Sequence, residues 1–340
     1  MTETQAILPE TQGAASVDLL SDVLSAMHLS GVVLFRTEFR EPWGLAAPDS
    51  RQMASMLPFR TEHIIPFHIV AEGACWLELE GHERVWLKEG DAVLLPYGDS
   101  HGLCGRLRGA KLPAAQLLPP LPWPDGLVVE HGGAGERTQI ICGFLQCDEL
   151  LFHPMLRNLP PLMHVRSEGL ASGGWLAHTI RHTAFEARQT HPGSRAMLPR
   201  LTELMFVEIL RNFMQSLPAT EVGWFAAAND AVVGAALKCM HMKLMDDWSV
   251  EKLAAQSGVS RTALTARFKH LLDMTPMHYL TGWRLQLAAQ RMKTADLPVK
   301  CIADEAGYVS EAAFSRAFKR HFGLPPAAWR RQQTPGRAGG

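Results

Sequence analysis

Basic and hydroxyl side chains recur in the same order in two stretches of the last hundred residues. In the first stretch, Ser260 precedes Arg261-Thr262, and Arg267-Phe268-Lys269 follows. In the second, Ser310 precedes the run Phe314-Ser315-Arg316-Ala317-Phe318-Lys319-Arg320. Lys and Arg neutralise phosphate groups, and an Arg can also donate two hydrogen bonds to the edge of a guanine. The pattern therefore predicts contacts with a nucleic acid.

The two stretches are copies of one unit. Corresponding residues lie 49 positions apart up to the glycine of each copy and 50 positions apart after it. The matched pairs are Ala254 and Ala303, Gly258 and Gly307, Leu264 and Phe314, Phe268 and Phe318, Lys269 and Lys319, and Pro276 and Pro326. An internal repeat of this kind indicates one supersecondary unit that is used twice.

Each copy predicts two short helices joined by a tight turn. A glycine ends the first helix, where a positive φ is expected, and a serine caps the start of the second. On the second helix, apolar residues recur at i and i+4 and bury one face. These residues are Gly258, Ser260, Leu264 and Phe268 in the first copy, and Gly307, Ser310, Phe314 and Phe318 in the second. The pattern is that of a helix-turn-helix, expected at about residues 249–271 and 298–322.

Charge is divided unequally along the chain. Residues 231–340 contain 16 Lys and Arg against 8 Asp and Glu, a net charge of +8. The whole chain of 340 residues has a net charge of −1, so residues 1–230 carry −9. A basic module beside an acidic one is typical of a protein that binds phosphates, and the alternative is a solvated helical surface.

This part of the chain resembles the DNA-binding domain of the AraC/XylS family of bacterial transcription regulators. The resemblance covers nearly a third of the chain. It implies two helix-turn-helix units joined by one long helix, here about Met277 to Lys293, whose recognition helices enter successive major grooves. The residues that carry it are Ile302-Ala303, Gly307-Tyr308, Phe314 to Lys319, Phe322-Gly323-Leu324-Pro325-Pro326 and Trp329-Arg330.

By match to the family motif, the exposed residues of the two recognition helices are expected to read DNA. They are Arg261, Thr262 and Thr265 in the first unit, and Glu311, Ala312, Ser315 and Arg316 in the second. Arg316 is the best candidate for a base contact. Ala266 departs from the family, which commonly has Arg there, so the first unit is expected to specify less. The residues expected to hold phosphates or to cover the helix surface are Arg267, Lys269, Lys319 and Arg320.

The first half of the chain predicts strands rather than helices after a short helix at residues 17–29. Short apolar or alternating runs, broken by Gly and Pro, are typical of a small antiparallel barrel or sandwich. They lie at residues 32–39, 64–70, 75–79, 85–87, 92–95 and 140–145. The run from Gly90 through Pro96 and Gly98 to His101 matches the second cupin motif, G-x5-P-x-G-x2-H.

The segment of about residues 20–160 therefore resembles the cupin-type sensor domain of one AraC branch. The residues that carry this resemblance are Phe67 to Val70, Cys75-Trp76-Leu77 and Gly90 to His101. The resemblance implies a signal sensed in the barrel, and inward strand positions such as His68, Trp76 and His101 are expected to line the effector pocket. The first cupin motif is eroded, with Ala74 where a metal-binding Glu would stand. His63, His68 and His101 are the weak candidates for a metal site, and no cofactor is expected.

Cysteine oxidation is a competing signal. The six cysteines form no CxxC pair, and thiols in a cytoplasmic protein are expected. Cys104, Cys142 and Cys147 are the redox candidates, although buried apolar cysteines remain the alternative. Residues 142 and 147 point to opposite faces of a strand, so a direct disulfide between them needs an intervening turn.

Two segments connect these regions. Residues 105–137, rich in Pro and Gly, are expected to form a flexible surface loop, with a lid over the barrel as the alternative. Helices are expected at residues 175–188 and 196–217. The second has an apolar stripe wide enough to pack on the barrel and on a second subunit, or to make one wide core contact.

The sequence predicts an α+β protein with three parts. They are an N-terminal antiparallel β cupin-like sensor domain (17–165), a helical linker or dimerisation region (166–228) and an all-α DNA-binding domain (229–334). The function expected is a cytoplasmic, homodimeric transcription regulator, an activator by the more frequent family behaviour. Its expected partners are promoter DNA, RNA polymerase and a small-molecule or redox signal, with no membrane segment. The alternatives are a metal-dependent cupin enzyme fused to a DNA-binding module and a thiol-based redox regulator.

Overall fold

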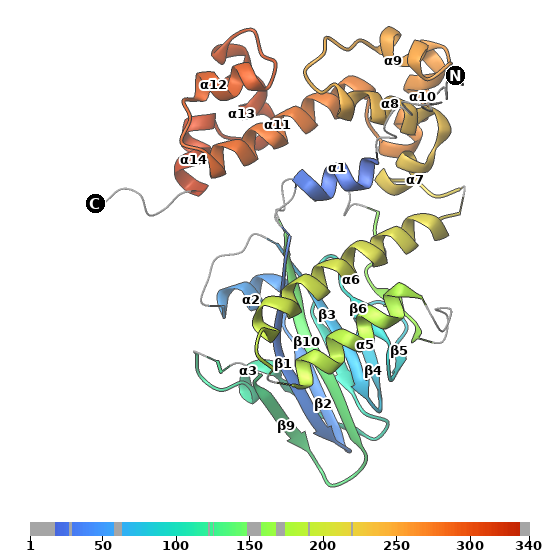
Figure 1. Cartoon of the computed structure of the whole chain (residues 1–340), viewed down its shortest axis with the longest axis vertical. Helices are drawn as coiled ribbons and strands as arrows, with labels where there is room; N and C mark the ends of the chain where they lie inside the picture. The colour runs from blue at the N-terminus through green and yellow to red at the C-terminus, as the bar shows by residue number, and fades with distance from the viewer. Residues whose placement is uncertain are drawn as a thin grey trace, which may run out of the picture.

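The computed structural model describes residues 18–26, 29–57, 63–121, 123–124, 126–147, 158–167, 174–189, 191–218 and 220–333. A β region with helices α5 and α6 on one side forms one end of the molecule, and the C-terminal helices form the other (Figure 1). Within the described residues, no helix is both long and apolar enough to cross a membrane.

The β region consists of two sheets. The six-stranded sheet has the order β11-β6-β3-β10-β1-β9, and the five-stranded sheet has the order β5-β4-β7-β2-β8. The strands of the first are β1 (Ser30–Arg40), β3 (His63–Glu72), β6 (Ala92–Leu94), β9 (Val128–Gly132), β10 (Arg137–Cys147) and β11 (Met163–Val165). Those of the second are β2 (Trp43–Ala47), β4 (Ala74–Leu79), β5 (Val85–Lys88), β7 (His101–Cys104) and β8 (Arg108–Pro113).

Most neighbouring strands are antiparallel, as the sequence predicts, but two edge pairs are parallel. β9 pairs with β1, and β8 pairs with β2. Both edge strands belong to residues 105–137, so the expectation of a flexible loop there is wrong. The segment also forms the short helix α3 (Ala114–Leu117). Its strand β8 is mostly exposed, and an exposed strand lacks the apolar alternation from which a strand is predicted.

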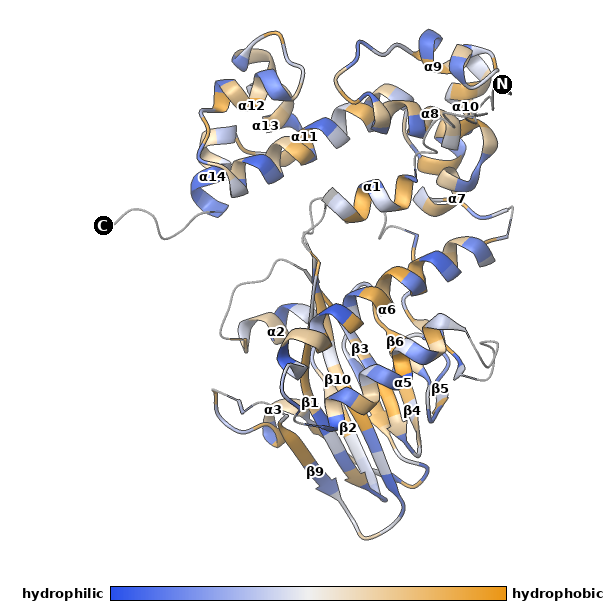
Figure 2. Ribbon diagram, viewed as in Figure 1, coloured by the Kyte–Doolittle hydropathy of each residue, from blue (hydrophilic) through white to orange (hydrophobic). Residues whose placement is uncertain are grey.

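The central strands of the six-stranded sheet are buried on both faces. Along β10, Ile140 and Cys142 face the core between the two sheets, whereas Ile141 and Leu145 face the helices. Side chains alternate between the faces of a strand, so a doubly buried strand is apolar almost throughout. Residues 140–145 of β10 accordingly include no charged or amide side chain, and Figure 2 shows hydrophobic segments within the strands, with hydrophilic residues toward their ends.

Helices α5 (Trp175–Arg188) and α6 (Ser194–Ser216) cover the outer face of this sheet. Met205, Phe206, Ile209 and Leu210 of α6 are buried there. Further along α6, Phe213 packs edge-on against Phe225 of α7 (Trp224–Asn229), with ring centroids 5.6 Å apart. The wide stripe of α6 is thus covered within one chain, and it gives no support to a second subunit.

The C-terminal region consists of helices only. They are α8 (Ala231–Met242), α9 (Val250–Gln256), α10 (Arg261–Leu272), α11 (Pro276–Thr294), α12 (Val299–Glu305), α13 (Glu311–Phe322) and α14 (Pro326–Gln333). The long helix α11 joins the two repeated units, as expected (Figure 1). Phe268 lies in the core of the first unit, and Phe318 lies in a separate core of the second.

The N-terminal helix α1 (Leu19–Ala26) links the two ends of the molecule. Its Leu19, Leu20 and Val23 are buried in the same cluster as Val233 and Leu237 of α8. In Figure 1, α1 lies between the β region and α11. A helix that precedes the first strand of the β region therefore packs on the C-terminal region.

Replacing Phe318 by Ala is expected to lower the free energy of unfolding by about 3–5 kcal/mol, because the ring is fully buried and its loss leaves a cavity. Urea unfolding followed by circular dichroism would measure this loss. Thr262→Ala, at an exposed position, is the control and should stay within about 0.5 kcal/mol of wild type. A loss below about 1 kcal/mol for Phe318→Ala would contradict the assigned core.

Candidate nucleic-acid interface and effector pocket

The two recognition helices begin with the same local geometry. The Ser260 hydroxyl accepts a hydrogen bond from the Ala263 amide at 3.2 Å, and the Ser310 hydroxyl accepts one from Ala313 at 3.2 Å. The turns before them place Gly258 at φ 68° and Gly307 at φ 76°, where a side chain would be strained. The expected caps and turn glycines are therefore confirmed, and they fix where α10 and α13 begin.

Each recognition helix buries one face and exposes the other. Leu264 and Phe268, and likewise Phe314 and Phe318, are fully buried. Of the residues expected to read DNA, Thr265 and Ser315 are half-buried, and those that are exposed are Arg261, Thr262, Glu311, Ala312 and Arg316. The predicted reading residues thus share the side of the helices that is turned away from the core.

The cations of the first unit are paired with carboxylates of the same chain. Arg261 lies 2.8 Å from Glu251, and Lys269 lies 2.5 Å from Asp273. Both are exposed pairs that water and salt screen, so exchange with a DNA phosphate costs little. They are available to DNA only after that exchange.

Arg267 has a different role. Its guanidinium lies 2.6 Å from a carboxylate oxygen of Asp230, and the other oxygen of Asp230 caps α8 by accepting from Val232 and Val233. Burial favours the protonated acid, but these hydrogen bonds outweigh it and lower the pKa of Asp230. Arg267 therefore ties α10 to the start of α8, and this contact competes with a phosphate.

The cations on the recognition helix of the second unit differ from those of the first. Within residues 220–333, Arg316, Lys319 and Arg320 have no carboxylate at salt-bridge distance, and all three are exposed. Free guanidinium and ammonium groups on one helix can neutralise phosphates without breaking an internal contact. The two units are therefore unequal in the charge that they offer to DNA.

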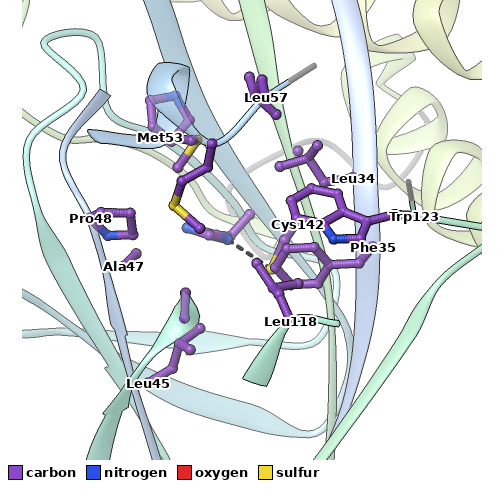
Figure 3. Close-up of a pocket in the computed structure, with 15 residues that line it drawn as sticks. Leu34, Phe35, Leu45, Ala47, Pro48, Met53, Leu57, Leu118, Trp123 and Cys142 are labelled. Carbon is purple, nitrogen blue, oxygen red and sulfur yellow. Dashed lines mark hydrogen bonds between the residues drawn. The ribbon is translucent and has the colours of Figure 1, made fainter. Parts of the chain in front are cut away.

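A second candidate site lies between the two sheets of the β region. This effector pocket has an empty volume of about 550 Å³, its mouth included, and its wall is almost entirely apolar (Figure 3). It is lined by Leu34, Phe35, Leu45, Ala47, Pro48, Met53, Met56, Leu57, Pro66, His68, Ala114, Leu118, Trp123, Cys142 and Gly143. A concave, apolar wall of this character is typical of sites for small apolar ligands.

Irregular features of the chain build this pocket. A register shift between Val33 and Phe35 in β1 lets the consecutive residues Leu34 and Phe35 both reach the pocket. Met53 comes from α2 (Ser50–Ser55), and Trp123 comes from the segment expected to be a loop. The alternation of residues along the predicted strands could not have identified these residues as part of a pocket. Trp123 in the wall favours the alternative that residues 105–137 include a lid.

One chain of hydrogen bonds begins at the polar part of this pocket. His68 and Cys142 line the pocket, whereas His101, which was expected to line it, lies outside the lining and contacts His68. His68 Nδ1 lies 3.2 Å from Cys142 Sγ, the bond that a dashed line marks beside Cys142 in Figure 3. His68 Nε2 lies 2.7 Å from His101 Nε2, and His101 Nδ1 lies 2.9 Å from the Asp99 carbonyl. Because the carbonyl can only accept, His101 donates from Nδ1 and accepts at Nε2. His68 then donates from Nε2 and accepts the thiol hydrogen of Cys142. The three side chains in this series of hydrogen bonds are therefore all neutral, and each contact joins a donor to an acceptor.

Burial keeps these groups neutral. It lowers the pKa of His68, with a further lowering from His101, and it lowers the pKa of His101. Burial also raises the pKa of Cys142, so its thiol is not a reactive thiolate at neutral pH. The observed arrangement is that of a structural cysteine rather than an oxidation sensor.

Trp76 does not line the pocket, contrary to expectation. Burial alternates along β4, where Cys75 and Leu77 face the core and Trp76 faces outward. Its ring lies 4.8 Å from that of Trp86, and the Arg84 guanidinium lies 4.2 Å above it. The residue that points inward is one position earlier in the strand, so the sequence assigned the wrong face.

The remaining candidates do not assemble into a site. Cys104 is buried, and burial raises the pKa of its thiol. The side chains of His63 and Cys147 lie outside the described residues. β10 is continuous from Arg137 to Cys147, so residues 142 and 147 are roughly 16 Å apart, too far for a direct disulfide. Among the described residues, no three His, Cys, Asp or Glu side chains form a metal-binding group.

Comparisons with known proteins decide between the alternatives. A cupin family model matches residues 18–215, and a helix-turn-helix domain model matches residues 253–332. An AraC-like transcription regulator of Streptomyces antibioticus is 32% identical over 282 residues, which cover 82% of this chain and 90% of the relative. The chain belongs to the AraC family.

Two further proteins are similar to this chain. RclR of Escherichia coli, an RCS-specific transcriptional activator, is 28% identical over 276 residues, or 80% of this chain and 87% of RclR. The DNA-binding domain of AdpA, solved with a target DNA, is 29% identical and covers 32% of this chain and 98% of that structure, with a TM-score of 0.29. This AraC-family member is a DNA-binding transcription regulator with a cupin domain. Its relatives are regulators and not enzymes, so the cupin enzyme alternative is rejected.

Arg316→Ala is expected to weaken specific DNA binding by about 5- to 100-fold, because a bidentate contact with guanine contributes about 1–3 kcal/mol. Arg261→Ala should weaken it less, since Arg261 is already paired with Glu251. Titration of a duplex from the region upstream of its own gene, over a salt series, would measure both. If Arg316→Ala lost equal affinity for specific and for random DNA, Arg316 would contact a phosphate rather than a base. A larger loss for Arg261→Ala would reverse the assigned order of the two units.

Proposed function

We propose that this AraC-family regulator activates transcription in response to an apolar small molecule in the effector pocket. In this proposal residues 17–165 sense the ligand, residues 166–228 link or dimerise, and residues 229–334 bind promoter DNA. The observation that carries it is the packing of α1, which belongs to the sensor, on α8 of the DNA-binding region.

The lining of the effector pocket supports an apolar ligand. Its polar groups, His68 and Cys142, already satisfy each other and His101, so a ligand needs no charge to balance there. Met53, Met56 and Leu118 offer flexible aliphatic surface around the rest of the wall. Unbranched thioether chains adapt to ligands of different shape at little cost.

β1 supports a direct path from the pocket to the DNA-binding helices. Leu34 and Phe35 line the pocket, and the same strand begins at Ser30, shortly after α1 ends at Ala26. A ligand that moves Leu34 shifts the strand to which α1 is attached. A ligand alters DNA binding only if it favours one of two arrangements of this contact.

The partners follow from the same proposal. Activation requires contact with RNA polymerase, and RclR, a relative over most of the chain, is an activator. A homodimer would use apolar surface outside the chain's own core, and Trp175 and Phe185 on α5 are 59% and 51% exposed. The thiol-based alternative has less support, because the Cys142 thiol is neutral and buried.

Met53→Asp is expected to weaken binding of the apolar probe 1-octanol about tenfold or more, because a carboxylate would be buried against the ligand. Met53 is half-buried on a surface helix, so the fold should tolerate the change. Calorimetric titration of the full chain measures the affinity, and Gln52→Asp, at the exposed neighbouring position, is the matched control. Unchanged binding by Met53→Asp would place the probe elsewhere.

Leu20→Ala is expected to leave 1-octanol affinity unchanged while abolishing the effect of 1-octanol on DNA affinity. The substitution removes most of a buried side chain that α1 uses to pack on the C-terminal region. DNA titrations with and without saturating probe measure the effect, and Ser21→Ala, exposed on the same helix, is the control. If Leu20→Ala kept the full effect, another path would have to couple the two regions.

A further inference from the structure

A second cavity lies in the DNA-binding region, away from the effector pocket. Its empty volume, mouth included, is about 960 Å³. The residues that the argument uses are Trp224 of α7, Leu272 of α10, Tyr279, Trp283 and Gln286 of α11, and His321 of α13. The cavity therefore touches both helix-turn-helix units and the long helix that joins them.

This cavity lies at the end of the recognition helices opposite to the predicted reading residues. Leu272 is the last residue of α10, and His321 is the last but one of α13. Arg261, the first residue of α10, and Arg316, in the first half of α13, are the candidates for base contacts. A ligand in the cavity could consequently bind while the protein holds DNA.

Aromatic rings form much of the wall. Trp224, Tyr279 and Trp283 line the cavity, and the polar groups of Trp224 and Tyr279 are already hydrogen-bonded. Trp224 Nε1 donates to the Tyr279 hydroxyl at 3.0 Å, and that hydroxyl lies 3.0 Å from His241 Nε2. Burial lowers the pKa of His241 to about 4, so its imidazole is neutral and accepts the hydroxyl hydrogen. What these residues offer a ligand is ring surface.

Gln286 is a polar group of this wall that the protein leaves unsatisfied. Its side chain is 8% exposed and lines the cavity, and its Oε1 is buried. Within the described residues, Oε1 has no hydrogen-bond donor. Buried amide groups normally have a partner, so a ligand that donates a hydrogen bond would complete this site.

The electrostatics of the wall favour a cation. The cavity is lined by no Lys or Arg of the described chain, although the surrounding region is strongly basic. Leu272 and His321 place the last turns of α10 and α13 at the cavity, and helix C-termini carry partial negative charge. His278 places the first turn of α11 there as well. The faces of Trp and Tyr also attract cations. Aromatic walls, helix C-termini and an unpaired amide oxygen all point to the same ligand class.

We propose that this cavity binds a small aromatic cation and that its occupancy sets the relative position of the two recognition helices. The ring packs among Trp224, Tyr279 and Trp283, and the charged group faces Gln286 and the helix ends. Because the ligand touches α10, α11 and α13 together, it favours one spacing of the two units. DNA affinity then changes with occupancy, and reciprocally ligand affinity changes with DNA.

The cavity wall is also joined to the sensor. Asn158, which precedes β11, lines the cavity and packs against Gly223, where φ is 105° and no side chain fits. The Gly223 amide donates to the Leu271 carbonyl of α10 at 2.7 Å. Gly223 therefore contacts both Asn158, next to the β region, and α10, so a ligand at this wall lies beside a link between the two.

The test uses benzylammonium, whose N–H groups can donate to Gln286 Oε1, as the probe and the full chain as the protein. Calorimetric or NMR titration is expected to give a Kd on the order of 1 mM, since the probe has few heavy atoms. Gln286→Leu should weaken binding about fivefold or more. Gly282→Leu should abolish it, because a Cβ there lies 3.4 Å from the His321 ring and a longer side chain fills the cavity. Gln256→Leu, exposed on α9, is the matched control.

Each outcome decides the proposal. Loss of binding in Gly282→Leu or Gln286→Leu, together with normal binding in Gln256→Leu and Met53→Asp, supports this cavity and separates it from the effector pocket. Saturating probe should also change DNA affinity about threefold or more. The proposal would be overturned if wild type did not bind the probe, or if both cavity variants bound it as tightly as wild type does. It would also be overturned if wild type bound the anion benzoate as tightly as the probe. Circular dichroism confirms folding, and the smaller change at Gln286 keeps the test valid if Gly282→Leu unfolds.

Discussion

The central strands of the six-stranded sheet have to be buried on both faces, and the rest of the molecule depends on this constraint. Alternate residues of β10 face opposite sides. Ile140 and Cys142 face the core between the two sheets, where Cys142 lines the effector pocket, and Ile141 and Leu145 face the helices. A ligand and the helical layer are therefore separated by one strand thickness. The helical layer continues without a break from α6 through α7 into the first DNA-binding unit. Packing alone thus joins the pocket to the helices that bind DNA.

The DNA-binding region shows how one repeated unit can acquire two roles. Both units have the same caps, turns and buried faces, but their charged residues have different partners. The cations of α10 pair with Glu251, Asp230 and Asp273, whereas Arg316 and Lys319 of α13 are exposed and have no such partner in the part of the chain that the structure describes. We infer that the second unit supplies more of the immediate attraction to phosphates. The first unit is held more firmly to α8 and so to the sensor.

Local signals explain what could be predicted from the sequence. Gly258, Ser260 and their copies act on neighbouring residues only, so the two units and the helix between them were predicted correctly. Trp76 was assigned to the wrong face, because a shift of one residue in a strand reverses every side chain. The strands in residues 105–137 pair with partners distant in sequence and lack apolar alternation. Ion pairs such as Arg267 with Asp230 likewise depend on the tertiary fold.

Amide hydrogen exchange of the full chain, with and without saturating 1-octanol, tests the central claim most directly. If α1 couples the effector pocket to the DNA-binding helices, ligand should change protection in β1, in α1 and in α8 together. The core of the second unit around Phe318 is separate and should keep its protection. Changes confined to the strands around the pocket, with α1 and α8 unaffected, would contradict the account.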